Sequence, residues 1–476
     1  MTNPTTNPSA PAVRPSRLWR RPFLIGVAGI GLVVLTVAGI FYYRWHVAEQ
    51  ALQDAIAEAD RLDPGWRLGE LEARRALVPD DKNSAVHINK AGSTGFAIRN
   101  AGSTGGAELK AVYEHLDKIP PHVRVTVEQA ELLRAALKPL AAPLADAHKV
   151  AELPTGRHHV DMSKPLEINL PHVDRGRFIV RLLSYDGMQH LHAGDFDSAW
   201  VCCRASLNIA RSFGDEPIDV TQSVRAGENR NAIRQVERTL AHGQVKDKAL
   251  AEMQKLLYEE FKHPALLIAV RGERAMIHEI FSHVEAGKIS AAELRQLGAQ
   301  TWGVPPGVKE EVAGYLSRHE FKPAHAWLLR YLTEAVEIVK LSGDSPEVPL
   351  RELEATLAHA PLLARQLAPK FERFATLKAS RALCGCAIAA LAAERYRLQH
   401  KHWPAALADL VAANLLDEVP TDPYDGKPLR LRATKSGIVI YSVGPNGDYG
   451  GTALDGNVPT ADNDRLEFRL WHAERR

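Results

Sequence analysis

The sequence predicts a mainly α protein with a single N-terminal transmembrane helix, a body of repeat-like helical hairpins and a small α+β C-terminal module. Three observations predict this class. An uncharged run of 21 residues lies near the N-terminus, apolar residues recur at helical spacing from about 126 to 397, and short β-type runs between Gly, Asn and Asp turns follow. We expect five segments: a disordered cytoplasmic tail at 1–21, a transmembrane signal anchor at 22–45, a stalk helix with loops at 46–125, an all-α body at 126–368 and the C-terminal module at 369–476.

The anchor runs from Phe23 to Tyr43 and matches the roughly 20 residues that a helix needs to cross the hydrocarbon core. A cleaved signal peptide is the alternative, but its apolar core is usually about 7–15 residues long. Four basic residues precede the run, at Arg14, Arg17, Arg20 and Arg21. Basic residues stay on the cytoplasmic side, so we expect a single-pass protein of the inner membrane with an extracytoplasmic body.

Composition limits the remaining classes. The chain has 476 residues, too many for one compact core, and its 59 Lys and Arg nearly balance 57 Asp and Glu. This balance argues against a nucleic-acid partner. Only four cysteines occur, as Cys202-Cys203 and Cys384-x-Cys386. We expect them to be small buried apolar side chains, with a long-range bridge between the two pairs left open.

The stretch after the anchor is expected to continue as an amphipathic stalk helix until Pro64-Gly65 ends it. Beyond it, the sequence AGSTG occurs twice, at 91–95 and 101–105. Because Gly is unfavourable inside helices and strands, we predict a mobile loop there. No Walker-type Lys follows these glycines, so they do not predict a phosphate site.

The body shows one well-defined helix pair, from Arg177 to Phe213, around a turn at Gly194-Asp195. Its pattern is similar to a single tetratricopeptide unit, in which a small Ala of the second helix packs close to the first. Weaker helical hairpins are predicted from Leu250 to Ala286 and from Ala324 to Leu367. The β candidates that follow are Leu429 to Arg432, Ile438 to Tyr441 and Leu466 to Leu470.

The C-terminal stretch from about Phe371 resembles the soluble part of the major (G-type) pseudopilins of type II secretion. The corresponding motifs are Tyr396 to Trp403-Pro404, Val419-Pro420-Thr421-Asp422-Pro423-Tyr424, Tyr441-Ser442-Val443-Gly444-Pro445-Asn446-Gly447, Gly450-Gly451 and Asp462-Asn463-Asp464. The resemblance implies a long helix followed by a small antiparallel sheet, and we expect residues from about 369 to fold independently. It also implies a structural Ca²⁺ ion held by Asp448, Asp462 and Asp464; the alternative is that these are solvated turn residues.

The chain departs from the pseudopilins at its N-terminus. Their hydrophobic segment follows a Gly cleavage site and carries a Glu, whereas the run from Phe23 to Tyr43 has none. Pilus assembly is therefore not expected. The rest of the chain, with Asp63-Pro64-Gly65-Trp66-Arg67-Leu68 and Gly272-Glu273-Arg274-Ala275, looks similar to uncharacterised membrane-anchored bacterial proteins that end in the same module, a resemblance that implies no activity.

No catalytic residue is predicted from motifs. His278 and His283 are spaced i, i+5 and so fall on different helical faces, unlike the i, i+4 pair of H-E-x-x-H. The cluster Arg157-His158-His159 is expected in a loop and lacks further ligand spacing. Sequences of the P-loop, dinucleotide-binding and nucleophile-elbow types do not occur.

The sequence therefore favours a non-catalytic, membrane-anchored envelope protein that binds a protein partner or acts as a scaffold. One alternative is a divergent component associated with type II secretion or pilus machinery. Another is a hydrolase whose site is assembled from residues distant in the sequence.

Overall fold

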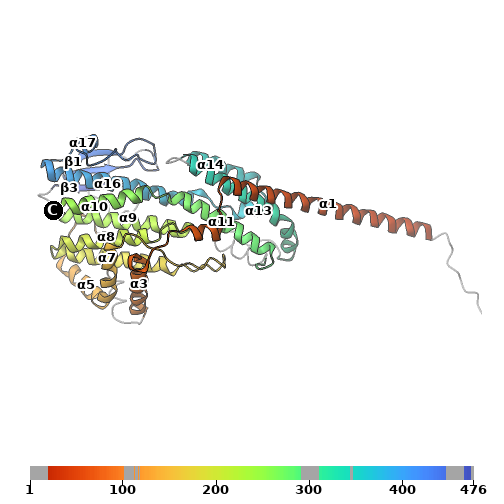
Figure 1. Cartoon of the computed structure of the whole chain (residues 1–476), viewed down its shortest axis with the longest axis horizontal. Helices are drawn as coiled ribbons and strands as arrows, with labels where there is room; N and C mark the ends of the chain where they lie inside the picture. The colour runs from red at the N-terminus through yellow and green to blue at the C-terminus, as the bar shows by residue number, and fades with distance from the viewer. Residues whose placement is uncertain are drawn as a thin grey trace, which may run out of the picture.

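The computed structural model of the protein describes residues 20–100, 112, 116, 118–290, 310–342, 347–445, 447 and 466–472, with the backbone alone at 20–24, 310–320, 342, 347 and 373. The described part is mainly helical and ends in a three-stranded sheet, as predicted (Figure 1). The helices are α1 (Arg20–Leu62), α2 (Leu68–Arg74), α3 (Ser84–Asn100), α5 (Val127–Leu137), α6 (Ala141–Lys149), α7 (Pro171–His192), α8 (Phe196–Ser212), α9 (Asp219–His242), α10 (Asp247–Phe261), α11 (Ala265–Glu285), α13 (Glu310–Ser342), α14 (Glu347–Ala355), α15 (Leu362–Leu367), α16 (Ala375–His400) and α17 (Ala408–Ala412). Short 3₁₀ turns occur at η2 (Asp80–Lys82), η3 (Lys138–Leu140), η4 (Val150–Glu152), η5 (Thr356–His359) and η6 (Phe371–Phe374), and the strands are β1 (Arg430–Thr434), β2 (Gly437–Tyr441) and β3 (Glu467–Trp471).

Helix α1 extends far beyond the body at its N-terminal end (Figure 1). This part is apolar and long enough to cross a membrane, a property that a signal sequence shares, and its side chains are not buried by the protein. Tyr43, the expected end of the span, is exposed. The surface of this segment suits lipid better than water.

The C-terminal half of α1 is the predicted stalk, and it packs along α13. Ala55 and Ala59 are buried there against Leu329 and Trp66, which form one apolar cluster. Polar contacts add to this packing, since Lys322 of α13 pairs with Glu49 and lies over the Trp45 ring. The helix that carries the apolar segment is thereby fixed to the body.

The predicted loop at 91–95 is wrong, because α3 includes the whole first AGSTG sequence. The glycines of α3 allow this helix to pack closely against α7. A Cβ atom at Gly92 would lie 2.4 Å from the Cβ of Arg175, and one at Gly95 would lie 2.4 Å from Cε1 of Phe178. Contact between α3 and α7 outweighs the low helix propensity of glycine. The second AGSTG sequence lies outside the described residues.

The predicted helix pair at 177–213 is confirmed by α7 and α8, which pack together around a turn where Gly194 has a φ of +76°. Asp195 begins α8 by accepting a hydrogen bond from the Ser198 amide. The predicted hairpin at 250–286 is wrong, although both of its helices form. Instead of pairing with each other, α10 packs on α16 and α11 packs on α13.

The strands occur within two residues of their predicted positions. β1 pairs with β2 and β2 with β3, both antiparallel, with Arg430 opposite Tyr441 and Ile438 opposite Leu470. Helix α16 covers β2 and β3, and α9 also contacts β3. Glu237 of α9 accepts a hydrogen bond from the Arg469 amide at 3.0 Å, which joins the sheet to the body.

The largest apolar cluster crosses the expected boundary at residue 369. It contains side chains from α8, α9, α10, α16 and the sheet, including Leu240, Leu257, Leu383, Ile440 and Phe468. Helix α16 is apolar enough to cross a membrane by composition, but it is mostly buried in this cluster. The C-terminal stretch thus completes the core of the body.

This shared core leads us to expect that a fragment of residues 369–476 does not fold alone, contrary to the expectation from the resemblance. Without α9 and α10, the apolar face of α16 would be exposed to water. A fragment of this size has a small free energy of unfolding and cannot tolerate that loss of burial. We expect the fragment of residues 369–476 to show no cooperative thermal transition by circular dichroism. A protein of residues 46–476 should melt cooperatively. A fragment with dispersed amide resonances and a sharp melt would contradict this expectation.

Candidate functional cleft

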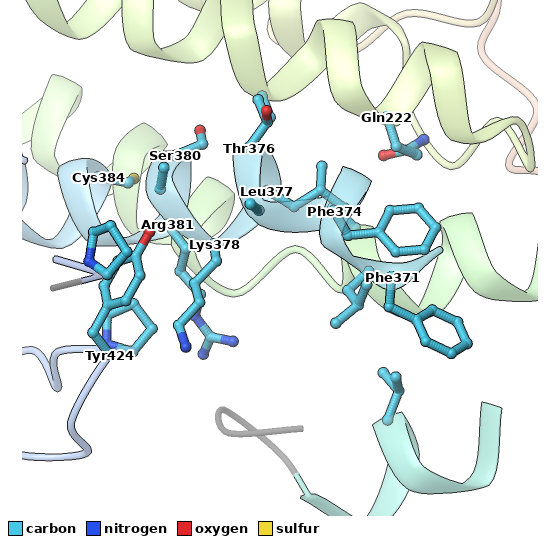
Figure 2. Close-up of a pocket in the computed structure, with 18 of the residues that line it drawn as sticks. Gln222, Phe371, Phe374, Thr376, Leu377, Lys378, Ser380, Arg381, Cys384 and Tyr424 are labelled. Carbon is cyan, nitrogen blue, oxygen red and sulfur yellow. The ribbon is translucent and has the colours of Figure 1, made fainter. Parts of the chain in front are cut away.

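A large cleft lies where α9, the α10–α11 connection, α14 and the first turns of α16 meet (Figure 2). Its volume is about 1220 Å³, and the loops around Tyr424 and Val443 line one side of it. Pockets for small molecules are usually about 300–1,000 Å³. The cleft is therefore large enough for several side chains of a partner.

The start of α16 places basic side chains along the cleft. Lys378 and Arg381 are three residues apart and so share one face of the helix. Phe374 is the N-cap, and the first turn of α16 carries no acidic residue. The partial positive charge of the helix N-terminus is therefore not offset within its own first turn.

Aromatic rings support these cations from neighbouring elements. The Lys378 ammonium lies 4.5 Å from the centroid of the Tyr424 ring, and the Arg381 guanidinium lies 4.9 Å from that of Phe261. Such cation–π contacts hold a charged side chain in place without neutralising it. The two contacts therefore help to fix both cations at the cleft.

One wall of the cleft contains a buried ion pair. Arg225 donates two hydrogen bonds to Glu260, at 2.8 and 2.6 Å. Burial raises the pKa of Glu260, but the charge and hydrogen bonds of Arg225 outweigh it and lower the pKa to about 2. Burial, aided by the charge of Arg225, lowers the pKa of His263 to about 3. Glu260 is therefore ionised and His263 neutral near pH 7.

The described lining carries a net positive charge, because seven Lys and Arg side chains face four Asp and Glu. The basic residues are Arg225, Arg230, Lys262, Lys340, Arg351, Lys378 and Arg381, and the acidic ones are Glu260, Glu354, Glu372 and Asp425. Apolar side chains lie among them, including Val348, which is 64% exposed. This mixture suits an acidic ligand that also carries apolar groups.

The thiol in the described lining of the cleft is not an activated nucleophile. Cys384 lines it, but burial raises the pKa of this thiol well above its usual value. The thiol donates a hydrogen bond to the carbonyl of Leu257 at 3.1 Å. A protonated, hydrogen-bonded thiol is a poor nucleophile.

The carboxylates expected to bind Ca²⁺, Asp448, Asp462 and Asp464, lie outside the described residues. Gly447 and Leu466, which flank this stretch of the chain, both line the cleft. The Ca²⁺ site stays a prediction.

The remaining candidate motifs have structural contacts. His278 lies 3.0 Å from His325, nitrogen to nitrogen, whereas His283 pairs with Glu279. The two histidines thus have separate partners, as their spacing predicts. His158 is buried, stacks on His172 and lies 3.0 Å from the Ser212 hydroxyl.

Two further sequences singled out above, at residues 63–68 and 272–275, meet in space. Asp63, just after α1, pairs with Arg271 and Arg274 of α11 and with Lys340 of α13. The Arg274 guanidinium also lies 5.2 Å from the ring centroid of Trp66. Arg274 and Trp66 are completely buried. This junction connects the stalk to the body.

Motif analysis missed the cleft because its cations come from five separate parts of the chain and form no local pattern. A signal existed only in the paired spacing of Lys378 and Arg381. Comparison of the chain with family models, curated proteins and solved structures gives no match. Its function is therefore inferred from its own residues.

Proposed function

We propose that the protein is a non-catalytic, membrane-anchored envelope protein whose helical body binds an acidic segment of a partner protein in the basic cleft. The observation that carries this proposal is the excess of Lys and Arg over Asp and Glu around a cleft of about 1220 Å³. A volume of this size fits a peptide segment better than a compact small molecule.

The anchor sets where such binding takes place. The four arginines before the apolar run favour a cytoplasmic N-terminus, which puts the cleft outside the cytoplasm, facing the envelope. The stalk is fixed to the body by Asp63 and its three cations, so the cleft stays near the membrane surface. A rigidly anchored acceptor is well suited to a scaffolding role.

The proposal is tested by photo-crosslinking in cells, with a crosslinking residue at Thr376, which lies in the cleft (Figure 2). We expect a discrete protein adduct that stays with the membrane after alkaline wash. The double change Lys378→Glu and Arg381→Glu should reduce its yield about tenfold or more, because like charges then face an acidic ligand.

Two controls define the result. Lys248→Glu with Lys255→Glu changes the net charge equally on α10 outside the cleft, and should leave the adduct unchanged. A crosslinker at exposed Gln244 should give no such adduct. No adduct from Thr376, or the same yield after reversal of Lys378 and Arg381, would exclude partner binding in the cleft.

A further inference from the structure

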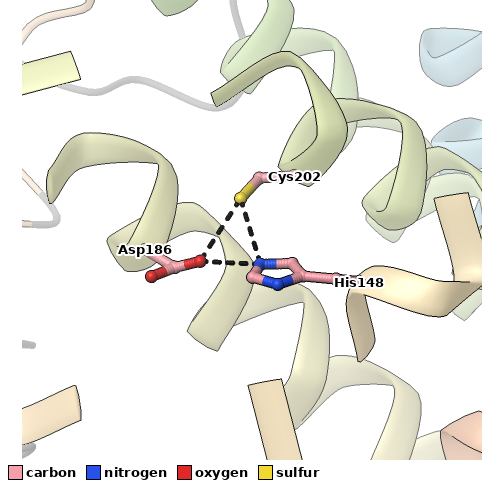
Figure 3. Close-up of side chains that lie close together, drawn as sticks. All are labelled: His148, Asp186 and Cys202. Carbon is pink, nitrogen blue, oxygen red and sulfur yellow. Dashed lines mark hydrogen bonds and ion pairs between the residues drawn. The ribbon is translucent and has the colours of Figure 1, made fainter. Parts of the chain in front are cut away.

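Three potential metal ligands from three helices converge on one point, away from the cleft. His148 lies near the end of α6, Asp186 in α7 and Cys202 in α8. Their donor atoms all lie within 4.8 Å of one another (Figure 3). Among the described residues, no other group of His, Cys, Asp and Glu donors converges in this way.

The helix pair of α7 and α8 creates this arrangement. The turn at Gly194 folds α8 back along α7, which brings Cys202 opposite Asp186. Helix α6 packs on both and adds His148 from the side. The three residues are far apart in the chain, so no motif spacing shows the cluster.

The geometry does not fit a nucleophilic triad. In such a triad one imidazole nitrogen faces the nucleophile and the other faces the carboxylate. Here the same Nε2 of His148 lies 2.7 Å from Asp186 Oδ2 and 3.7 Å from Cys202 Sγ. Burial, together with the nearby Asp186 charge, raises the pKa of Cys202 well above its usual value, so the thiol is not activated.

Two of the three distances instead match edges of a tetrahedral metal site. Bonds of about 2.0 Å to N and O and about 2.3 Å to S place tetrahedral sulfur about 3.5 Å from either neighbour, and N about 3.3 Å from O. Cys202 Sγ lies 3.5 Å from Asp186 Oδ2 and 3.7 Å from His148 Nε2. The His148–Asp186 distance of 2.7 Å is a hydrogen bond that would have to lengthen by about 0.6 Å on metal binding.

A neighbouring histidine supports the carboxylate. His190 Nε2 lies 3.5 Å from Asp186 Oδ2, and its Nδ1 lies 3.3 Å from Asp195 Oδ2. These contacts orient the Asp186 carboxylate, as outer partners orient metal-binding carboxylates.

We propose that His148, Asp186 and Cys202 bind a divalent transition-metal ion of the Zn²⁺ type, with the fourth position open to solvent. The mixed S, N and O donor set is typical of Zn²⁺, and three protein ligands with one open position are typical of exchangeable or catalytic zinc. His148 is 35% exposed, which gives an ion access to the site. On binding, the Cys202 thiol loses its proton to solvent and its sulfur bonds to the metal.

The test uses the untagged full-length protein in detergent, stripped with a chelator and titrated with Zn²⁺ or Co²⁺. Zn²⁺ should raise the melting temperature, and one equivalent of Co²⁺ should give a thiolate-to-metal charge-transfer band. Affinity should rise with pH, because binding displaces a proton. His148→Ala and Asp186→Asn should weaken binding about 100-fold or more, since loss of even an outer-shell partner costs about 10–100-fold.

Cys203 provides a matched control, because it is the adjacent thiol, is equally buried and contacts Thr239 at 3.3 Å, not the cluster. Cys203→Ser should keep the charge-transfer band, and Cys202→Ser should abolish it. If Cys202→Ser does not fold, loss of the band in His148→Ala tests the site through its most exposed ligand. A stripped wild-type protein that does not respond to either ion, or a band that survives Cys202→Ser, would overturn the proposal.

Discussion

Asp63→Ala is expected to destabilise the protein by about 3–5 kcal/mol, because it leaves a buried cation without its counter-charge. Arg274 is completely buried, and its Nε and Nη1 atoms have no hydrogen-bond partner among the described residues. The carboxylate of Asp63 also lies 3.2 Å from the Lys340 ammonium. Denaturant-induced unfolding of the detergent-solubilised protein, followed by tryptophan fluorescence, measures this change.

The matched control is Asp54→Ala, at an exposed residue of α1, the helix that ends just before Asp63, and it should change stability by no more than about 0.5 kcal/mol. Equal effects of the two changes would show that the junction does not stabilise the fold. The pH dependence gives a second readout. Burial raises the pKa of Asp63, but Arg271 and Arg274 lower it by a larger amount, so the pKa in the folded protein lies below the usual value. The stability that ionised Asp63 contributes to the folded protein is therefore fully present above the unfolded pKa of about 3.9. It is lost as the pH falls through the folded pKa.

Gly272→Ala is expected to destabilise the protein by about 1–3 kcal/mol, although alanine is the better helix former. A Cβ at this position in α11 would lie 2.1 Å from the carbonyl oxygen of Pro217. Because this neighbour is backbone, it cannot rotate away, and the segment leading into α9 would have to shift. Thermal unfolding of the purified variant and wild type measures the loss.

Gly227→Ala should have the opposite effect on stability. Gly227 lies inside α9, and, apart from the adjoining residues and backbone of that helix, no described heavy atom lies within 4 Å of the position of its missing Cβ. The substitution should therefore stabilise by about 0.5–1 kcal/mol through helix propensity alone. If both alanine variants were more stable than the wild type, Gly272 would not be in close contact with the backbone of Pro217.

The elements with a strong local pattern could be predicted from the sequence. The apolar run after Arg21, the helix pair around Gly194 and the three strands are each specified by period and turn residues. The glycines of 91–95 show where local reasoning fails. Their low helix propensity was outweighed by contacts with Arg175 and Phe178, which are more than 80 residues away in the chain.

By itself, the sequence determined an apolar N-terminal helix, a mainly helical body and a short C-terminal sheet, because periodicity and turn chemistry act over a few residues. Only the tertiary structure decided which helices pack together. The two candidate sites depend on this packing, because their residues come from different helices. Lys378 of α16 contacts the Tyr424 ring, and Cys202 of α8 contacts His148 of α6, because packing brings distant segments together. The buried core that joins α10 to α16 likewise depends on residues 127 apart, such as Cys384 and Leu257, and no local pattern encodes such a pairing.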